Sequence, residues 1–142
     1  MALDDQISRY LDSIPEPKRT DMRKLHDAVL ELNPGCQLWF LDGKDESGKV
    51  VSNPNIGYGT LHKKYADGNI KSFYQVGISA NSMGLSVYIM GMDDKSYLRE
   101  KYTHAIGKAS ITGYCIKFKA LKDISLDTLK QAIQEGMTRT SA

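Results

Sequence analysis

The central part of the chain, residues 56–92, sets the strongest constraint on the fold. Its side chains alternate between apolar and polar with a period of two, which is typical of β-strands. Two short polar turns interrupt the alternation, at residues 66–69 and 81–84, and the first contains an Asp-Gly pair. Asp-Gly favours a tight hairpin because both central residues of such a turn take positive φ. The segment therefore predicts a meander of three antiparallel strands, over residues 56–65, 70–80 and 85–92.

Helical patterns lie on both sides of this meander. Apolar residues at spacings of three and four predict four helices, over residues 3–14, 17–32 and 97–106 and from Ser125 onward. Period-two alternation predicts two more strands, over residues 37–41 and 112–119. The sequence therefore predicts a single α+β domain over residues 1–142, in which an antiparallel β-sheet packs against N- and C-terminal helices.

Composition limits the classes of function. The 142 residues are 41% hydrophobic and 25% charged, as in ordinary globular domains, and the net charge of +2 argues against a nucleic-acid partner. No window approaches the roughly 18 apolar residues of a membrane span, and the acidic start is unlike a signal peptide. The two cysteines lie far apart and form no Cys-x-x-Cys motif. We therefore expect a cytoplasmic protein with neither a nucleic-acid nor a membrane partner.

Short motifs keep a fixed order along most of the chain. They are Tyr10-Leu11-Asp12-Ser13-Ile14-Pro15-Glu16-Pro17, Ile56-Gly57-Tyr58-Gly59, Val76-Gly77-Ile78-Ser79, Leu85-Ser86-Val87-Tyr88-Ile89 and Cys115-Ile116-Lys117-Phe118-Lys119. With these motifs the chain resembles the YdhG-like bacterial family of domains of unknown function. Residues 109–114 depart from the family pattern, because they lack the basic and polar run of the relatives. The resemblance implies a frataxin-like α/β sandwich, and some relatives are regarded as intracellular iron chaperones.

The acidic residues of the first two predicted helices are the candidate iron ligands under this resemblance. Asp5 and Asp12 share a helix face at a spacing of seven, and Asp27 and Glu31 share one at a spacing of four. Carboxylate oxygens suit weakly held iron. Basic residues are interleaved with them, however, and would repel Fe²⁺. An ordinary solvated helix surface is therefore the favoured interpretation, and we expect no cofactor, with iron as the alternative.

A second candidate group surrounds His62 in the first strand of the meander. We expect His62 to share a strand face with Tyr58 and Lys64, because side chains two residues apart point the same way. Together with Tyr65 they could form a pocket for an anion or a polar ligand. The alternative is an ordinary solvent-facing strand. No nucleophile–base pair or metal motif accompanies His62, so an enzyme is the less favoured class.

The two faces of the predicted sheet differ in character. If Tyr74, Val76 and Ile78 face inward, the opposite face carries Phe73, Gln75, Ser86, Tyr88, Met90, Lys117 and Lys119. That face would be aromatic and basic if the helices cover only one side. It could then stack nucleic-acid bases or accept a partner protein, but cover by residues 42–55 or by a second subunit is the favoured interpretation.

These patterns favour a non-enzymatic module that binds a small molecule or a protein, with a homodimer as one possibility. The alternative function is a frataxin-like intracellular iron chaperone. The predicted ligand-binding residues are His62, Lys64, Tyr65, Tyr58, Phe73, Tyr88 and Lys117. The predicted metal ligands under the alternative are Asp5, Asp12, Asp27 and Glu31.

Overall fold

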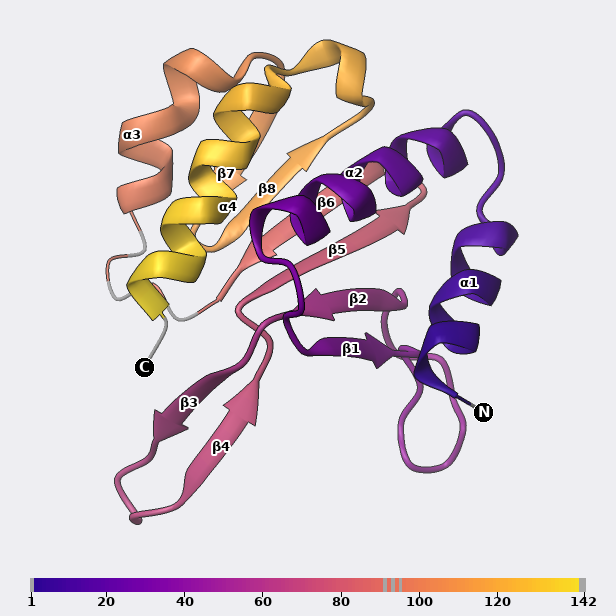
Figure 1. Ribbon diagram of the computed structural model, residues 1–142, viewed down its shortest axis with the longest axis vertical. Helices are drawn as coiled ribbons and strands as arrows, with labels where there is room; N and C mark the ends of the chain where they lie inside the picture. Colours follow the sequence, from indigo (N-terminus) through magenta and orange to yellow (C-terminus); the bar gives the residue numbers. More distant parts are fainter. Residues whose placement is uncertain (1, 91, 93, 95, 141–142) are drawn as a thin grey trace.

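A computed structural model describes residues 2–90, 92, 94 and 96–140, and these residues form an α+β fold (Figure 1). The helices are α1 (Leu3–Ser13), α2 (Lys18–Leu32), α3 (Tyr97–Ile106), α4 (Leu126–Thr140) and a 3-10 turn (Leu121–Asp123). The strands are β1 (Leu38–Leu41), β2 (Asn55–Tyr58), β3 (Leu61–Lys64), β4 (Ile70–Phe73), β5 (Val76–Asn81), β6 (Gly84–Ile89), β7 (Ala109–Thr112) and β8 (Cys115–Phe118). The predicted fold class, with helices at both ends of the chain and an antiparallel sheet, is confirmed.

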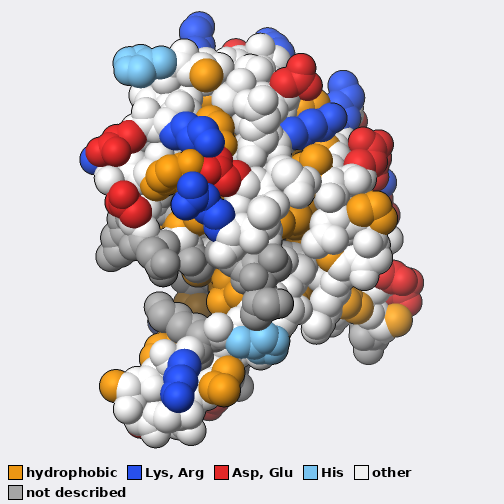
Figure 2. All heavy atoms as spheres, turned by 60° about the vertical axis from the view of Figure 1, so that its left-hand side comes forward, with side chains coloured by type: hydrophobic (Ala, Val, Ile, Leu, Met, Phe, Trp, Pro, Cys, Tyr) orange, Lys and Arg blue, Asp and Glu red, His pale blue; other side chains and the backbone are white. Residues whose placement is uncertain are grey.

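Six strands form the main sheet in the order β1-β2-β5-β6-β8-β7, and every pairing is antiparallel. Strands β3 and β4 pair only with each other and form a separate hairpin. This hairpin extends away from the body of the protein (Figures 1 and 2). No helix among the described residues is both long and apolar enough to cross a membrane.

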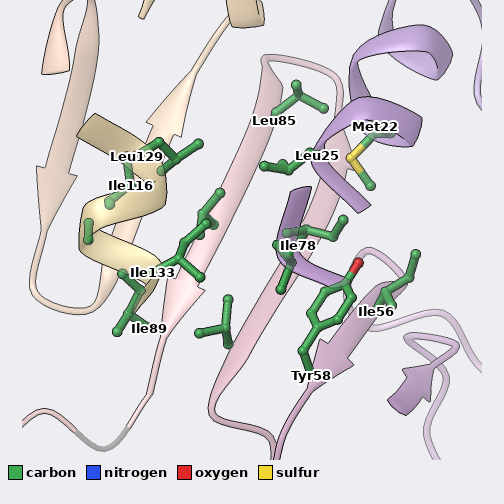
Figure 3. Close-up of a cluster of buried hydrophobic side chains, with 14 of the residues drawn as sticks. Met22, Leu25, Ile56, Tyr58, Ile78, Leu85, Ile89, Ile116, Leu129 and Ile133 are labelled. Carbon is green, nitrogen blue, oxygen red and sulfur yellow. The ribbon is translucent and has the colours of Figure 1, made fainter. Parts of the chain in front are cut away.

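The core lies between the main sheet and the helices. Helices α2 and α4 lie across one face of the sheet (Figure 1), and their buried side chains meet those of the strands (Figure 3). The strand residues predicted to face inward are 5% exposed or less, namely Val76, Ile78, Leu85, Val87, Ile89, Ile116 and Phe118. We call this side of the sheet the helix face and the opposite side the far face. In Figure 1 no helix among the described residues crosses the far face.

The two long strands predicted for residues 56–65 and 70–80 are each broken in the middle. The first breaks at Gly59, whose φ of 75° suits glycine, and the second breaks at Tyr74 and Gln75. The break reverses the direction of two side chains. Gln75 points to the helix face, where its Nε2 donates to the carbonyl oxygen of Met137 in α4 at 3.0 Å. The prediction that Tyr74 faces inward and Gln75 outward is therefore wrong.

The ring of Tyr74 lies on the far face, against Gly57 and Gly77. A Cβ atom on Gly77 would come within 2.6 Å of this ring, and one on Gly57 would overlap it as well. Phe73 stacks on the outer side of Tyr74, with ring centroids 4.1 Å apart, and Trp39 meets Phe73 edge-on at 6.1 Å. Tyr74 is consequently only 4% exposed. The strand glycines thus allow an aromatic side chain to approach the backbone closely.

The C-terminal part of the sheet also differs from the prediction. The single strand expected over residues 112–119 is a hairpin of β7 and β8, and β7 was not predicted. Strand β6 ends at Ile89, earlier than expected, and position 91 of the predicted strand lies outside the described residues. The extra strand β7 places residues 109–112 beside β8.

We predict that Gly77→Ala destabilises the fold by about 1–3 kcal/mol, because the new methyl group must displace the Tyr74 ring. Urea unfolding measures the change, with the exposed Ser110→Ala on the same face as a control expected to stay within about 0.5 kcal/mol. In a Tyr74→Ala background the cost of Gly77→Ala should largely disappear. An equal cost in both backgrounds would show that Tyr74 is not the reason for glycine at this position.

Candidate functional site

The far face is built from two cross-strand rows of side chains. The first row contains Trp39, Gly57, Gly77, Tyr88, Cys115 and Thr112. The second row contains Leu41, Asn55, Ser79, Ser86, Lys117 and Ser110. Tyr88, Ser86 and Lys117 therefore lie on the face that the sequence predicted for them. The segment before β2 reaches this face at Ser79, whose Oγ donates to the carbonyl oxygen of Pro54 at 2.7 Å.

Aromatic rings extend across the far face from β1 to the β7–β8 turn. We call this set the aromatic band, and its members are Trp39, Phe73, Tyr74, Tyr88 and Tyr114. The Tyr88 and Tyr114 rings are tilted by 45° with centroids 6.3 Å apart. Burial, with smaller electrostatic contributions from Tyr88 and Tyr114, raises the pKa of Tyr74. Tyr88 is partly buried and Tyr114 is 50% exposed, so this end of the band is open to solvent.

An open groove lies beside the β5–β6 turn, where far-face side chains of β6, β7 and β8 meet Leu85, Ala109 and Phe118 of the helix-face row. Its polar lining consists of Asn81, Ser86, Lys108, Ser110, Lys117 and Lys119. The three lysines are exposed, and Lys117 lies directly across the ladder from Ser110 in β7. We call this feature the lysine groove.

The residues predicted around His62 are divided between two places. His62, Lys64 and Tyr65 lie in the β3–β4 hairpin and are exposed. The Nδ1 atom of His62 is 2.7 Å from the Oγ atom of Ser72 on the paired strand. Lys71 lies over the Tyr65 ring, with its Nζ atom 5.3 Å from the centroid. The group is therefore a solvent-facing surface of the hairpin.

Tyr58 does not join this group, because it lies in the main sheet and is fully buried at 0% exposed. Its hydroxyl is 2.6 Å from the Nδ1 atom of His26 in α2. Burial lowers the pKa of His26 and raises that of Tyr58 well above its ordinary value. The predicted shared face of Tyr58, His62 and Lys64 is wrong, since β2 and β3 are separate strands in separate sheets.

The carboxylates proposed as iron ligands do not converge. Asp12 of α1 is bound to Arg23 of α2, so a cation already neutralises it. Asp27 and Glu31 are exposed on α2, and Asp5 is exposed on α1. No group of three or more His, Cys, Asp or Glu side chains in the described part of the chain could hold a metal ion. The iron alternative stays a prediction without a site assembled from these residues.

A second polar cluster joins α3 to α4 on the helix side. The carboxylate of Glu135 accepts hydrogen bonds from the hydroxyls of Tyr97 and Tyr102, from Lys101 Nζ at 2.9 Å and from Arg139 Nε at 3.2 Å. Burial opposes its ionisation, but the hydrogen bonds from Tyr102, Tyr97 and Lys101 outweigh burial and lower the pKa of Glu135 to about 2. A carboxylate held so firmly in its ionised form is a poor general base, and its hydrogen bonds with Tyr97, Tyr102 and Lys101 link α4 to α3.

Several far-face residues were missed from the sequence. Tyr74 was assigned to the wrong face because the strand break was not recognised, and Lys108 and Ser110 were missed because β7 was not predicted. Trp39 could have been predicted, because it alternates with Leu38 and Phe40 and so points to the opposite face of the sheet from them.

The geometry defines a class of protein: an α+β domain whose antiparallel sheet carries helices on one face and an aromatic, basic surface on the other. No family model, curated protein or solved structure matches the chain. The resemblance to the YdhG-like family therefore stays a prediction.

The Glu135 cluster predicts a specific dependence of stability on pH. The pKa of Glu135 falls from 4.5 to about 2 on folding, so its contribution is complete above about pH 4.5 and is lost as the pH falls through 2. Glu135→Gln should lower the free energy of unfolding by about 1 kcal/mol at neutral pH. Urea unfolding of both proteins should show this difference shrinking below pH 4.5. A difference that is constant from pH 7 to pH 2 would contradict the assigned role.

Proposed function

We propose that this protein is a non-enzymatic binding module that holds a small molecule or a partner protein against the open end of the far face. The observation that carries the proposal is the grouping of partly buried Tyr88, half-exposed Tyr114 and exposed Lys117 on the face that the helices leave free. Tyrosine rings offer a large contact area at little cost in conformational entropy, and they can stack on planar groups. The surface therefore suits contact with a planar or partly apolar ligand.

The titratable groups of the far face support binding rather than catalysis. Burial raises the pKa of the Cys115 thiol, although Lys117 partly offsets the effect. Burial also raises the pKa of the Tyr88 hydroxyl. A nucleophilic cysteine needs a lowered pKa, because the thiolate is the reactive form. Both groups thus stay protonated near neutral pH.

The finer assignments rest on the sequence. The ordered motifs support membership of the YdhG-like family, and the two distant cysteines, which form no Cys-x-x-Cys motif, support a cytoplasmic location. A second copy of the chain remains one candidate partner for the far face. Sedimentation velocity at increasing protein concentration distinguishes this homodimer from capture of a small molecule.

The proposal predicts that 8-anilinonaphthalene-1-sulfonate, an anion with a planar naphthalene ring, binds the folded protein at Tyr88 and Tyr114. Tyr88→Ala and Tyr114→Ala should each weaken binding of this dye by about tenfold, which corresponds to roughly 1.4 kcal/mol of lost stacking. Fluorescence titration measures the affinity, and thermal unfolding verifies that each variant is folded.

The matched control is Tyr65→Ala, which removes an exposed tyrosine from the β3–β4 hairpin. Its affinity for the dye should equal that of the unmodified protein. If Tyr65→Ala loses binding while Tyr88→Ala and Tyr114→Ala retain it, the hairpin is the binding element and the proposal is wrong. Absence of dye binding to the folded protein would also reject it.

A further inference from the structure

We infer that the lysine groove is a binding site for a phosphate-type oxyanion, which would be the charged group of the ligand held by the far face. The inference rests on the proposed function, because the groove and the open end of the aromatic band belong to one surface. It adds the chemical class of the ligand, a small molecule that carries both a planar ring and a phosphate group.

Three lysines from the β7–β8 hairpin line the groove together. Ser110 of β7 lies directly across from Lys117 of β8, and Ala109 lies across from Phe118. Lys108 immediately precedes β7 and Lys119 immediately follows β8, and both line the groove together with Lys117. Like charges that line one groove repel each other, and an anion between the ammonium groups relieves this repulsion.

Among the described residues, no acidic side chain neutralises these lysines. The lining contains no carboxylate, and none of its three lysines forms an ion pair with another described residue. Lys101 shows the contrast, because a carboxylate oxygen of Glu135 lies 2.9 Å from its Nζ atom. The positive charge of the groove is therefore available to an external anion.

Two serine hydroxyls, of Ser110 and Ser86, lie beside the lysines in the groove. The Ser110 hydroxyl is exposed on the same face, and no described residue is bonded to it. At the other side of Lys117 lies Ser86, only 1% exposed, whose Oγ accepts a hydrogen bond from Asn81 Nδ2 at 3.0 Å. Ser86 also forms hydrogen bonds with the side chains of Tyr88 and Cys115, so Ser110 is the hydroxyl of the groove that is open to an anion. Lysine ammonium groups together with hydroxyl donors are a common way of binding phosphate.

The spacing of the two rows connects the groove to the aromatic band. Lys117 is two residues from Cys115 in β8, and Cys115 lies directly across the ladder from Tyr88. The side chains of Lys117 and Tyr88 therefore emerge on the same face of the sheet. A separation of two residues along a strand is roughly 7 Å. A phosphate at Lys117 therefore lies within reach of a ring that stacks on Tyr88 or Tyr114, as in a ring-bearing phosphate monoester.

The test is titration of the full chain with two probes, inorganic pyrophosphate and 1-naphthyl phosphate, followed in ¹H–¹⁵N spectra. Pyrophosphate should cause saturable shifts in the amides of residues 108–110 and 117–119. Lys108→Gln and Lys117→Gln should each weaken pyrophosphate binding by about fivefold to tenfold. Lys117→Arg, which keeps the charge, should retain most of the affinity.

The matched control is Lys24→Gln, which removes one charge from the exposed surface of α2 at a residue that does not line the groove. It should leave pyrophosphate binding unchanged. Equal losses for Lys24→Gln and Lys117→Gln would mean general charge attraction and would overturn the inference. Shifts scattered over the whole surface would overturn it too.

The two probes separate this inference from the proposed function. If 1-naphthyl phosphate binds and depends on Tyr88 while pyrophosphate fails to bind, the groove is not an anion site but the binding module stands. If pyrophosphate binds through the lysines while Tyr88→Ala and Tyr114→Ala leave 1-naphthyl phosphate unaffected, the anion site stands and the aromatic part of the proposed function fails.

Discussion

The packing of the Tyr74 ring on Gly57 and Gly77 is the interaction on which the far face depends. A sheet with helices on one side only must protect the apolar atoms of its other side in some other way. Here the ring of Tyr74, which lies at the junction of β4 and β5, covers the backbone of the sheet. Phe73 stacks on Tyr74, and Trp39 contacts Phe73. Because two adjacent strands carry glycine at this row, the ring can lie flat against the backbone.

This packing divides the far face into two unequal parts. Over β1, β2 and β5 the surface is closed by stacked rings, and Tyr74 is almost completely buried there. Over β6, β8 and β7 the surface stays open, with Tyr88, Tyr114 and Lys117 partly or largely exposed. In the open part, Tyr88 and Lys117 lie on strands β6 and β8 of the main sheet, and Tyr114 lies in the turn between β7 and β8.

Periodicity alone predicted the architecture because helices and buried strands bury a regular pattern of side chains. The inward row from Val76 to Phe118 follows a strict period of two, and the structure confirms it. The same rule failed at Tyr74 and Gln75, since the break between β4 and β5 interrupts the alternation at these two residues. The break at Gly59 separated Tyr58 from His62 for the same reason.

The candidate site was harder to predict than the fold, because it depends on which strands become neighbours. Lys117 was assigned to the correct face, but its neighbours Ser110 and Lys108 come from β7, a four-residue strand with a weak pattern. Nothing in the sequence shows that the two ends of this hairpin bring three lysines together without a carboxylate. Such a juxtaposition becomes visible only when the strand order is known.

The most direct test of the account is the solvent accessibility of individual tyrosines in solution, measured by photochemically induced nuclear polarisation at low protein concentration. The account predicts polarisation of Tyr114 and, more weakly, of Tyr88, with no signal from Tyr74. Polarisation of Tyr74 without polarisation of Tyr88 and Tyr114 would contradict this description of the far face. The surface over Tyr74 would then be open to solvent, and the proposed binding surface at Tyr88 and Tyr114 would be covered.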